Sequence, residues 1–276
     1  MRTHLYSLCR LSALPEGIAG RGEKTVSTSE HAYHQIKNRI LAALPPDEYE
    51  RLSPHFEHVR LPHGRVLIEH GEPIRDVYFP NDALISLVTQ LSDGAAVEAA
   101  VAGREGMAGL PVVLGADSTA TRSVVQIPGA AVRVKAKIIR DAFGRGGVLQ
   151  SRLLAYAHAL FIEAAQSAAC NAHHQLDARL ARWLLTSSDG VGSDEFPLTH
   201  EFIATMMGVR RAGVTCAAFA LKEAELINYH RGCIQILDRG GLEATACECY
   251  RAIKDQVKLL VGGGNDVPSV SQKTLH

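Results

Sequence analysis

The apolar positions along the chain change their period twice. Between about residues 31 and 146, short apolar and β-branched segments alternate with turn residues, which is typical of antiparallel strands. From 147 to 173, apolar and small residues recur at the 3.6-residue spacing of a helix. After 174, amphipathic helical segments surround two further β-like runs. The pattern therefore predicts an α+β chain with a strand-rich first part and a mainly helical second part.

The strand-rich part predicts a jelly-roll-like antiparallel β-roll. Turn signals such as His70-Gly71-Glu72-Pro73 and Ser92-Asp93-Gly94 separate its apolar runs. Ahead of it, a helical pattern begins at Ser29 and stops at Pro45, and a short second helix follows with Pro46 in its first turn. The expected strands are Arg65–Ile68, Asp76–Phe79, Ala83–Leu91, Ala95–Val101, Arg122–Ile127 and Ala130–Val134.

The segment from 147 to 173 predicts one long helix. At about 1.5 Å per residue it is roughly 40 Å long, which is more than one compact domain needs. Two interpretations stay open, because the apolar stripe can pack on the chain's own roll or form the seam of a two-chain dimer. The small alanines in the stripe favour the dimer. Its members are Leu153, Ala157, Leu160, Ala164 and Ala168.

Residues 198–222, which read LTHEFIATMMGVRRAGVTCAAFALK, predict two short helices joined by a tight turn. Thr199 suits the N-cap of the first helix. Gly208 can take the positive φ that ends it. Ala204 is small enough for the two helices to cross closely. This arrangement is a helix-turn-helix.

Two neighbouring features favour DNA over another use of this motif. Arg210 and Arg211 stand at the N-terminal end of the second helix, where an arginine can bridge O6 and N7 of guanine. The β-like runs Leu226–Asn228 and Cys233–Leu237 predict a wing hairpin, whose Arg231 can reach phosphate. The alternative is that the arginine pair only solvates a helix end.

Composition limits the partners and the compartment. The chain of 276 residues has 29 basic and 29 acidic residues, so a general basic coat is absent and any DNA contact must come from local clusters. No run of 18 apolar residues predicts a membrane span. Six dispersed cysteines do not suggest a disulfide scaffold, so we expect a cytoplasmic protein. Residues 1–30 and 262–276 are expected to be mobile tails.

The order of β-roll, long helix and winged helix-turn-helix resembles the Crp/Fnr family of bacterial transcription regulators, from about Asn38 to Tyr250. The phrase LTHEFIATMMGVRRAGVT is similar to the DNA-binding motif of the family, and LPHGRVLIEHGEPIRDVYF and GMAGL resemble its roll sequences. The resemblance implies a cyclic-nucleotide-binding-like sensor roll at 31–146, a dimerisation helix at 147–173 and a winged helix-turn-helix domain at 174–261. It further implies a homodimer that binds double-stranded promoter DNA, works with RNA polymerase and is not an enzyme.

The same resemblance suggests which residues contact DNA. Thr199 and His200 occupy phosphate-contact positions, and Arg211 occupies a base-reading position. Ala212 and Cys216 stand where the catabolite-activator branch carries a glutamate and a second arginine, so we expect a different operator. The candidate DNA contacts are Thr199, His200, Arg210, Arg211, Thr215, Cys216 and Arg231.

The ligand of the roll stays open. Cyclic-nucleotide-binding relatives use a carboxylate in a Gly-Glu-Leu segment and a later Arg-Ser pair. The matching candidates here are Gly106 with Met107, and Arg122 with Ser123. Methionine cannot accept the ribose hydroxyl bond, which argues against a cyclic nucleotide as the ligand, whereas Arg122 and Ser123 match its phosphate-binding pair. A different ligand, or a roll kept as a scaffold, are the alternatives, and no cofactor is certain.

No metal site is expected. Cys247 and Cys249 fall on a predicted helix from Leu242 to Val261, where residues two apart diverge by about 200°. His173-His174 are interpreted as the end of the long helix. The rival functions are a cyclic-nucleotide-binding module that controls a partner protein and a helix-turn-helix that contacts protein. The wing and the arginine-led helix favour a DNA-binding regulator.

Overall fold

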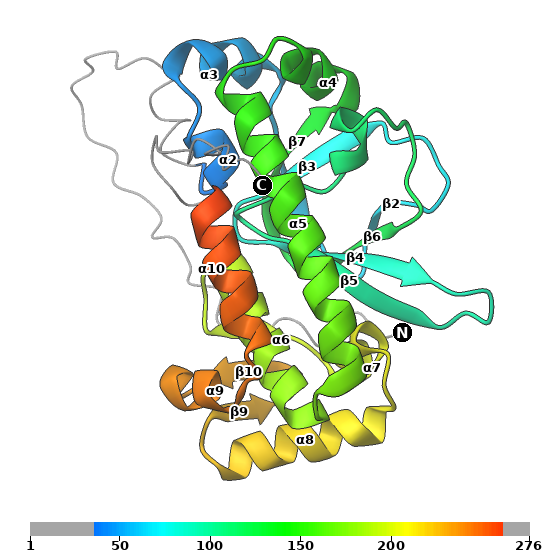
Figure 1. The fold of residues 1–276 in the computed structure, drawn as a ribbon, viewed down its shortest axis with the longest axis vertical. Helices are drawn as coiled ribbons and strands as arrows, with labels where there is room; N and C mark the ends of the chain where they lie inside the picture. Colours follow the sequence, from blue (N-terminus) through cyan, green and yellow to red (C-terminus); the bar gives the residue numbers. More distant parts are fainter. Residues whose placement is uncertain (1–35, 262–276) are drawn as a thin grey trace, which may run out of the picture.

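The computed structural model describes residues 36–261, so both predicted tails and the predicted helix start at Ser29 lie outside the described residues. A β-roll and a smaller helical domain lie at opposite ends of the molecule (Figure 1). The long helix α5 (Val148–His173) joins them, and α10 (Cys249–Val261) packs along it. The α+β architecture predicted from the sequence is confirmed.

The chain enters the roll through two short helices, α2 (Arg39–Ala42) and α3 (Pro46–Leu52). Buried Asn38 caps α2, because its side-chain oxygen accepts hydrogen bonds from the N–H groups of Ile40 and Leu41. Its amide group donates to the carbonyl oxygens of Pro80 and Gly106 at 3.0 and 2.9 Å. One polar side chain therefore fixes the entry segment onto the roll.

The roll consists of two antiparallel sheets with strand orders β1-β7-β3 and β2-β6-β4-β5. The six predicted strands are present, with ends within one residue of the prediction. The additional strand β1 was not predicted. Most of its residues are exposed and several are charged, so its sequence lacks the apolar positions that mark the other strands. The strands are β1 (Glu57–Leu61), β2 (Val66–Ile68), β3 (Asp76–Pro80), β4 (Leu84–Gln90), β5 (Ala96–Ala102), β6 (Arg122–Ile127) and β7 (Gly129–Lys135).

A carboxylate from α3 caps the long helix. After α4 (Ala136–Gly144) the chain turns through two glycines with positive φ. The N–H groups of Val148 and Leu149 then donate to the Glu48 carboxylate at 2.7 and 2.9 Å. Negative charge at a helix N-terminus is stabilising, so Glu48 fixes the start of α5 against the roll.

The predicted stripe on α5 divides between two faces. Leu153 is fully buried in the chain's own core, together with Leu149 and Tyr156. Ala168 is exposed, and the other members of the stripe are half-buried. On the outer face, Leu154 is 49% exposed and Phe161 is 73% exposed. Leu153 therefore belongs to the roll core and is not available for a dimer seam.

The helical domain contains the predicted helices and strands in the predicted order, with three differences from the sequence prediction. A short strand, β8 (Glu195–Pro197), pairs with the second strand of the wing and was not predicted. The composition of Ser187–Asp194 predicts a loop, but Ser187–Val191 is helical, because Ser187 accepts a hydrogen bond from buried Gln126 at 2.9 Å and α6 continues to its C-cap Gly192. The predicted helix from Leu242 to Val261 is broken between Thr245 and Cys249. The elements are α6 (Leu176–Val191), β8 (Glu195–Pro197), α7 (His200–Met207), α8 (Arg211–Glu223), β9 (Ile227–His230), β10 (Cys233–Ile236) and α9 (Arg239–Thr245).

The helical domain shares a core with the second sheet of the roll. Leu84, Val88 and Ile127 from the roll belong to the same buried cluster as the core of the helix-turn-helix. At the turn of the motif, a Cβ on Gly208 would lie 2.8 Å from Cγ2 of Val97 in β5. The two domains are therefore in direct contact. None of the helices in residues 36–261 is long and apolar enough to cross a membrane.

Candidate DNA interface and ligand cavities

The two helices of the motif are built as the sequence predicts. Thr199 caps α7, since its hydroxyl oxygen accepts a hydrogen bond from the Phe202 N–H at 3.2 Å. Gly208 ends α7 with φ +64°. Ala204 is buried at the crossing, next to Val214 of α8. The steric requirements of a helix-turn-helix are met at each of these positions.

The second helix presents a continuous exposed face. Its inner face is buried, and Arg211 lies at its first residue. Nε of Arg211 lies 3.6 Å from Oε2 of Glu201, but both side chains are about 70% exposed, so water screens this pair and the guanidinium stays available. Phe219, 62% exposed, extends this face, and the sequence reasoning missed it. The face consists of Arg211, Ala212, Thr215, Cys216 and Phe219.

His200 holds the motif together instead of pointing outward. Its Nδ1 lies 3.2 Å from Oγ1 of Thr215, and its ring stacks on Tyr229 with centroids 4.2 Å apart. Its Nε2 is buried without a hydrogen-bond partner among the described residues. Burial, and then the nearby charge of Arg211, lower the pKa of His200. The side chain therefore connects α7, α8 and the wing, and the phosphate contact expected from the sequence stays a prediction.

The wing is a tight hairpin formed by β9 and β10. Its two turn residues, Arg231 and Gly232, both have positive φ, at +48° and +79°, as a two-residue hairpin turn requires. Arg231 is exposed at the tip. The Leu198 N–H donates to the Gly232 carbonyl at 2.9 Å, which holds the tip beside the start of α7. Thr199, the first turn of α7 and Arg231 thus lie on one side of the motif.

A cavity of about 300 Å³ lies between the roll and α5. Met107 and Ser123 line it, and Met107 is fully buried. Arg122 does not line it, because its guanidinium Nε donates to Glu69 Oε2 at 3.0 Å. Gly106 lies under the Tyr156 ring, where a Cβ would be 2.3 Å from the ring. Two of the four predicted ligand residues therefore meet at this cavity, and its lining holds no charged side chain among the described residues.

We expect no saturable binding of cyclic AMP by the purified protein. The cavity offers methionine where a ribose hydroxyl needs an acceptor, and the Arg122 charge is already paired with Glu69. An unmatched polar contact costs about 1–3 kcal/mol. Isothermal titration calorimetry measures this directly. Binding of one nucleotide per chain at micromolar affinity, abolished by Arg122→Ala, would contradict the expectation.

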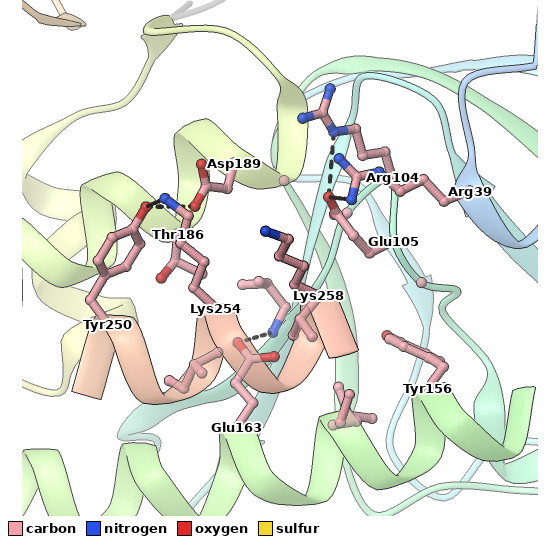
Figure 2. Close-up of a pocket in the computed structure, with 18 residues that line it drawn as sticks. Arg39, Arg104, Glu105, Tyr156, Glu163, Thr186, Asp189, Tyr250, Lys254 and Lys258 are labelled. Carbon is pink, nitrogen blue, oxygen red and sulfur yellow. Dashed lines mark hydrogen bonds and ion pairs between the residues drawn. The ribbon is translucent and has the colours of Figure 1, made fainter. Parts of the chain in front are cut away.

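A second pocket of about 440 Å³ lies between α10, α5, α6 and the loop after β5. Figure 2 shows Lys258 between two polar groups in this view. In the first group, Glu105 lies 3.4 Å from Arg104 Nε and 3.6 Å from Arg39. In the second, the Tyr250 hydroxyl donates to Asp189 at 2.8 Å. The pocket is suited to a polar ligand, and sequence reasoning missed it because its residues come from distant segments.

Two carboxylates, buried Glu163 and half-buried Glu98, lie beside this pocket. Glu163 on α5 accepts a hydrogen bond from the Val101 N–H at 3.3 Å, and Glu98 accepts one from Trp183 Nε1 at 2.7 Å. Burial, and then repulsion by Glu98, raise the pKa of Glu163 to about 8. Burial raises the pKa of Glu98 to about 7. The folded protein therefore holds these protons at a pH where the unfolded chain has lost them.

This pair predicts that stability falls as pH rises from about 4.5 to about 8. The folded state binds more protons in that window, and each group contributes a loss of up to about 1.4 kcal/mol per pH unit. Glu163→Gln keeps the shape of the side chain without its charge. The free energy of unfolding should therefore fall less steeply with pH, and the variant should be more stable than the parent at pH 8. Urea unfolding across this window tests it. Glu50→Gln, on an exposed residue of α3, is the matched control, and an unchanged slope in Glu163→Gln would refute the assignment.

Comparison with known proteins agrees with this geometry. Residues 178–245 match the Crp-like helix-turn-helix domain family. The fold is similar to FixK2 from Bradyrhizobium japonicum, with 17% identity, coverage of 70% of this chain and 98% of that chain, and a TM-score of 0.59. It is similar to TTHB099, a CRP-family transcriptional regulator from Thermus thermophilus, with 19% identity, 68% and 96% coverage and a TM-score of 0.57.

A third similar structure is CLP, a c-di-GMP-responsive global regulator from Xanthomonas campestris, with 12% identity, 70% and 99% coverage and a TM-score of 0.55. No curated protein matches the sequence. The low identities make these likenesses evidence for the fold. Residues 178–245 therefore belong to the Crp-like helix-turn-helix domain family, and the chain shares the fold of these regulator structures.

Proposed function

We propose that the protein is a cytoplasmic, non-enzymatic transcription regulator that binds promoter DNA sequence-specifically as a homodimer. The observation that carries the proposal is the exposed, arginine-led face of α8 with the wing tip beside it. A helix of this kind enters the major groove with its N-terminal residues toward the base edges. The winged domain then directs RNA polymerase as the family resemblance implies. A module that only controls a partner protein has no use for this face.

The outer face of α5 supports the dimer. Five of its exposed apolar residues are spaced by seven, four, three and four positions, which is the pattern of a coiled-coil seam, and exposed Ala169 lies beside them. Phe161, the largest of them, lies near the middle of the helix. A two-fold axis along this seam would place two copies of α8 at half-sites about one helical turn apart. The seam residues are Leu154, Phe161, Ala165, Ala168 and Ala172.

The proposed DNA contacts are of two kinds, to base edges in the major groove and to backbone phosphates. Arg211 is the proposed guanine reader. Ala212, Cys216 and Phe219 are suited to thymine methyl groups, since apolar side chains contact that group in the major groove. Arg231, Arg210 and the first-turn N–H groups behind Thr199 are placed to hold phosphates. His200 and Thr215 act mainly by positioning α7 against α8.

The sensor ligand that we propose is a small uncharged molecule in the 300 Å³ cavity. The lining combines Leu87, Met107 and Leu160 with the hydroxyls of Ser123 and Thr121. Apolar walls with a few hydroxyls favour an uncharged ligand over a phosphate-bearing one. The c-di-GMP to which CLP responds carries two phosphates, so it does not fit this cavity chemically.

Selection of DNA from a random duplex pool by the purified protein tests the function. We expect an enriched motif with two-fold symmetry and half-sites about one helical turn apart. With Arg211→Ala the enriched motif should lose its guanine at one position in each half-site, whereas Arg145→Ala, a matched control on the exposed end of α4, should select the parent motif. A pool that stays random would contradict the proposed function.

A further inference from the structure

Four metal-binding side chains converge where α5 ends and α10 begins. Cys170 and His174 lie one turn apart at the end of α5, Cys247 lies in the segment between α9 and α10, and Cys249 is the first residue of α10. Their ligand atoms all lie within 4.8 Å of one another. The sequence prediction excluded this because it placed Cys247 and Cys249 on one continuous helix. The break after Thr245 removes the divergence and turns both thiols toward α5.

The spacing of these atoms matches a single tetrahedral ion. Sγ of Cys170 lies 3.5 Å from Sγ of Cys247, and Sγ of Cys249 lies 3.5 Å from Nδ1 of His174. Zinc bonds of about 2.3 Å to sulfur and 2.0 Å to nitrogen place tetrahedral ligands about 3.5–3.8 Å apart. A disulfide would need the two sulfurs at about 2.05 Å. Three thiols and one imidazole also make up a common structural zinc ligand set.

The surrounding hydrogen bonds orient the ligands in the same way. His174 presents Nδ1 to the cluster, and its Nε2 lies 3.2 Å from Oε1 of Glu248. Histidines that bind metals usually donate their other ring N–H to a carboxylate or carbonyl, which fixes the tautomer. The Gln166 amide donates to Sγ of Cys249 at 3.1 Å, a contact that stabilises a thiolate. All three cysteines are buried, so water does not compete for the cluster.

We propose that Cys170, His174, Cys247 and Cys249 bind one zinc ion. Soft thiolates with an imidazole select zinc over calcium or magnesium, which prefer oxygen ligands. The four atoms lie too close together to surround an iron–sulfur cluster. Cys170 and His174 precede the winged domain in the sequence, and Cys247 and Cys249 follow its helix α9. The ion would therefore link the two ends of this domain at the end of α5. It thereby fixes the orientation of the DNA-reading helix relative to the dimer helix.

Metal analysis of the full-length protein, expressed with zinc and purified without chelator, tests the site. We expect about one zinc ion per chain by mass spectrometry. Cys247→Ser and His174→Ala should each lose most of it, whereas His174→Cys should keep it because a fourth thiolate completes the tetrahedron. Cys216→Ser, on the exposed face of α8, is the matched cysteine control and should bind zinc like the parent.

A second measurement does not depend on whether the variants fold. Cobalt(II) added to metal-free parent protein should produce the intense visible bands of a tetrahedral thiolate complex, and titration with a thiol-binding mercurial should release zinc in step with three modified cysteines. Absence of both zinc and these bands in the parent would overturn the proposal. Full zinc in a folded Cys247→Ser variant, iron in place of zinc, or a Cys170–Cys247 disulfide in protein purified under reducing conditions would each overturn it as well.

Discussion

Replacing Phe161 with glutamate should convert the protein into a monomer. Phe161 is 73% exposed on the outer face of α5 and stands in the centre of the proposed seam. In a dimer the new carboxylates would be buried near their two-fold mates without partners, and such uncompensated charges are strongly destabilising. A monomer can occupy one half-site at a time, so the affinity for a full operator should fall by at least about 100-fold.

Sedimentation velocity at micromolar concentration, followed by binding to the selected operator, measures both effects. Leu91→Glu changes another exposed leucine, at the end of the β4–β5 hairpin, and should leave the dimer and its affinity unchanged. If the parent protein sediments as a monomer, the seam is wrong. If Phe161→Glu stays dimeric and folded, dimerisation must use a different surface.

Arg211→Ala should remove the preference for guanine at one position in each half-site. Arg211 lies in the first turn of α8, and an arginine–guanine pair discriminates by about 1–3 kcal/mol. The two-fold symmetry of the dimer doubles this on a full operator, to about 2–6 kcal/mol. The affinity for operators with another base at that position should change far less, because the variant loses the guanine contact and keeps most of the non-specific electrostatic attraction to DNA.

Competition against operators with single-base changes distinguishes a base contact from a phosphate contact. A base contact predicts a loss confined to one position, whereas a phosphate contact predicts a uniform loss and a smaller salt slope. Arg145→Ala serves here again as a control for the removal of one positive charge. A uniform loss in Arg211→Ala would reassign this residue to the backbone.

The roll strands could be predicted to within one residue because glycine, proline and asparagine mark nearly every turn. Strand β1 could not, since its exposed charged residues hide the alternation that identifies a strand. The end of α6 was misjudged for the opposite reason. Ser187-Ser188-Asp189-Gly190 has loop composition, but Gln126 of the roll and Asp194 supply partners that only the tertiary structure brings near.

The helix-turn-helix was predictable because its steric requirements all lie within the single stretch 198–222. The His200 contacts were not, since Tyr229 approaches from the wing. The proposed zinc cluster needs a break in the backbone near Cys247, where neither glycine nor proline gives a signal. The two cavities are lined by residues from segments that lie far apart in the sequence, so no local sequence pattern predicts them.

The contact between Gly208 and Val97 has a mechanical consequence. The turn of the helix-turn-helix rests on β5 with no space for a methyl group, and the packed interior beneath it continues into the roll. Closely packed interiors transmit strain instead of absorbing it. A displacement of β5 would therefore be passed on to α7 and to α8, which packs against α7. The β4–β5 hairpin thus connects the roll mechanically to the turn of the helix-turn-helix.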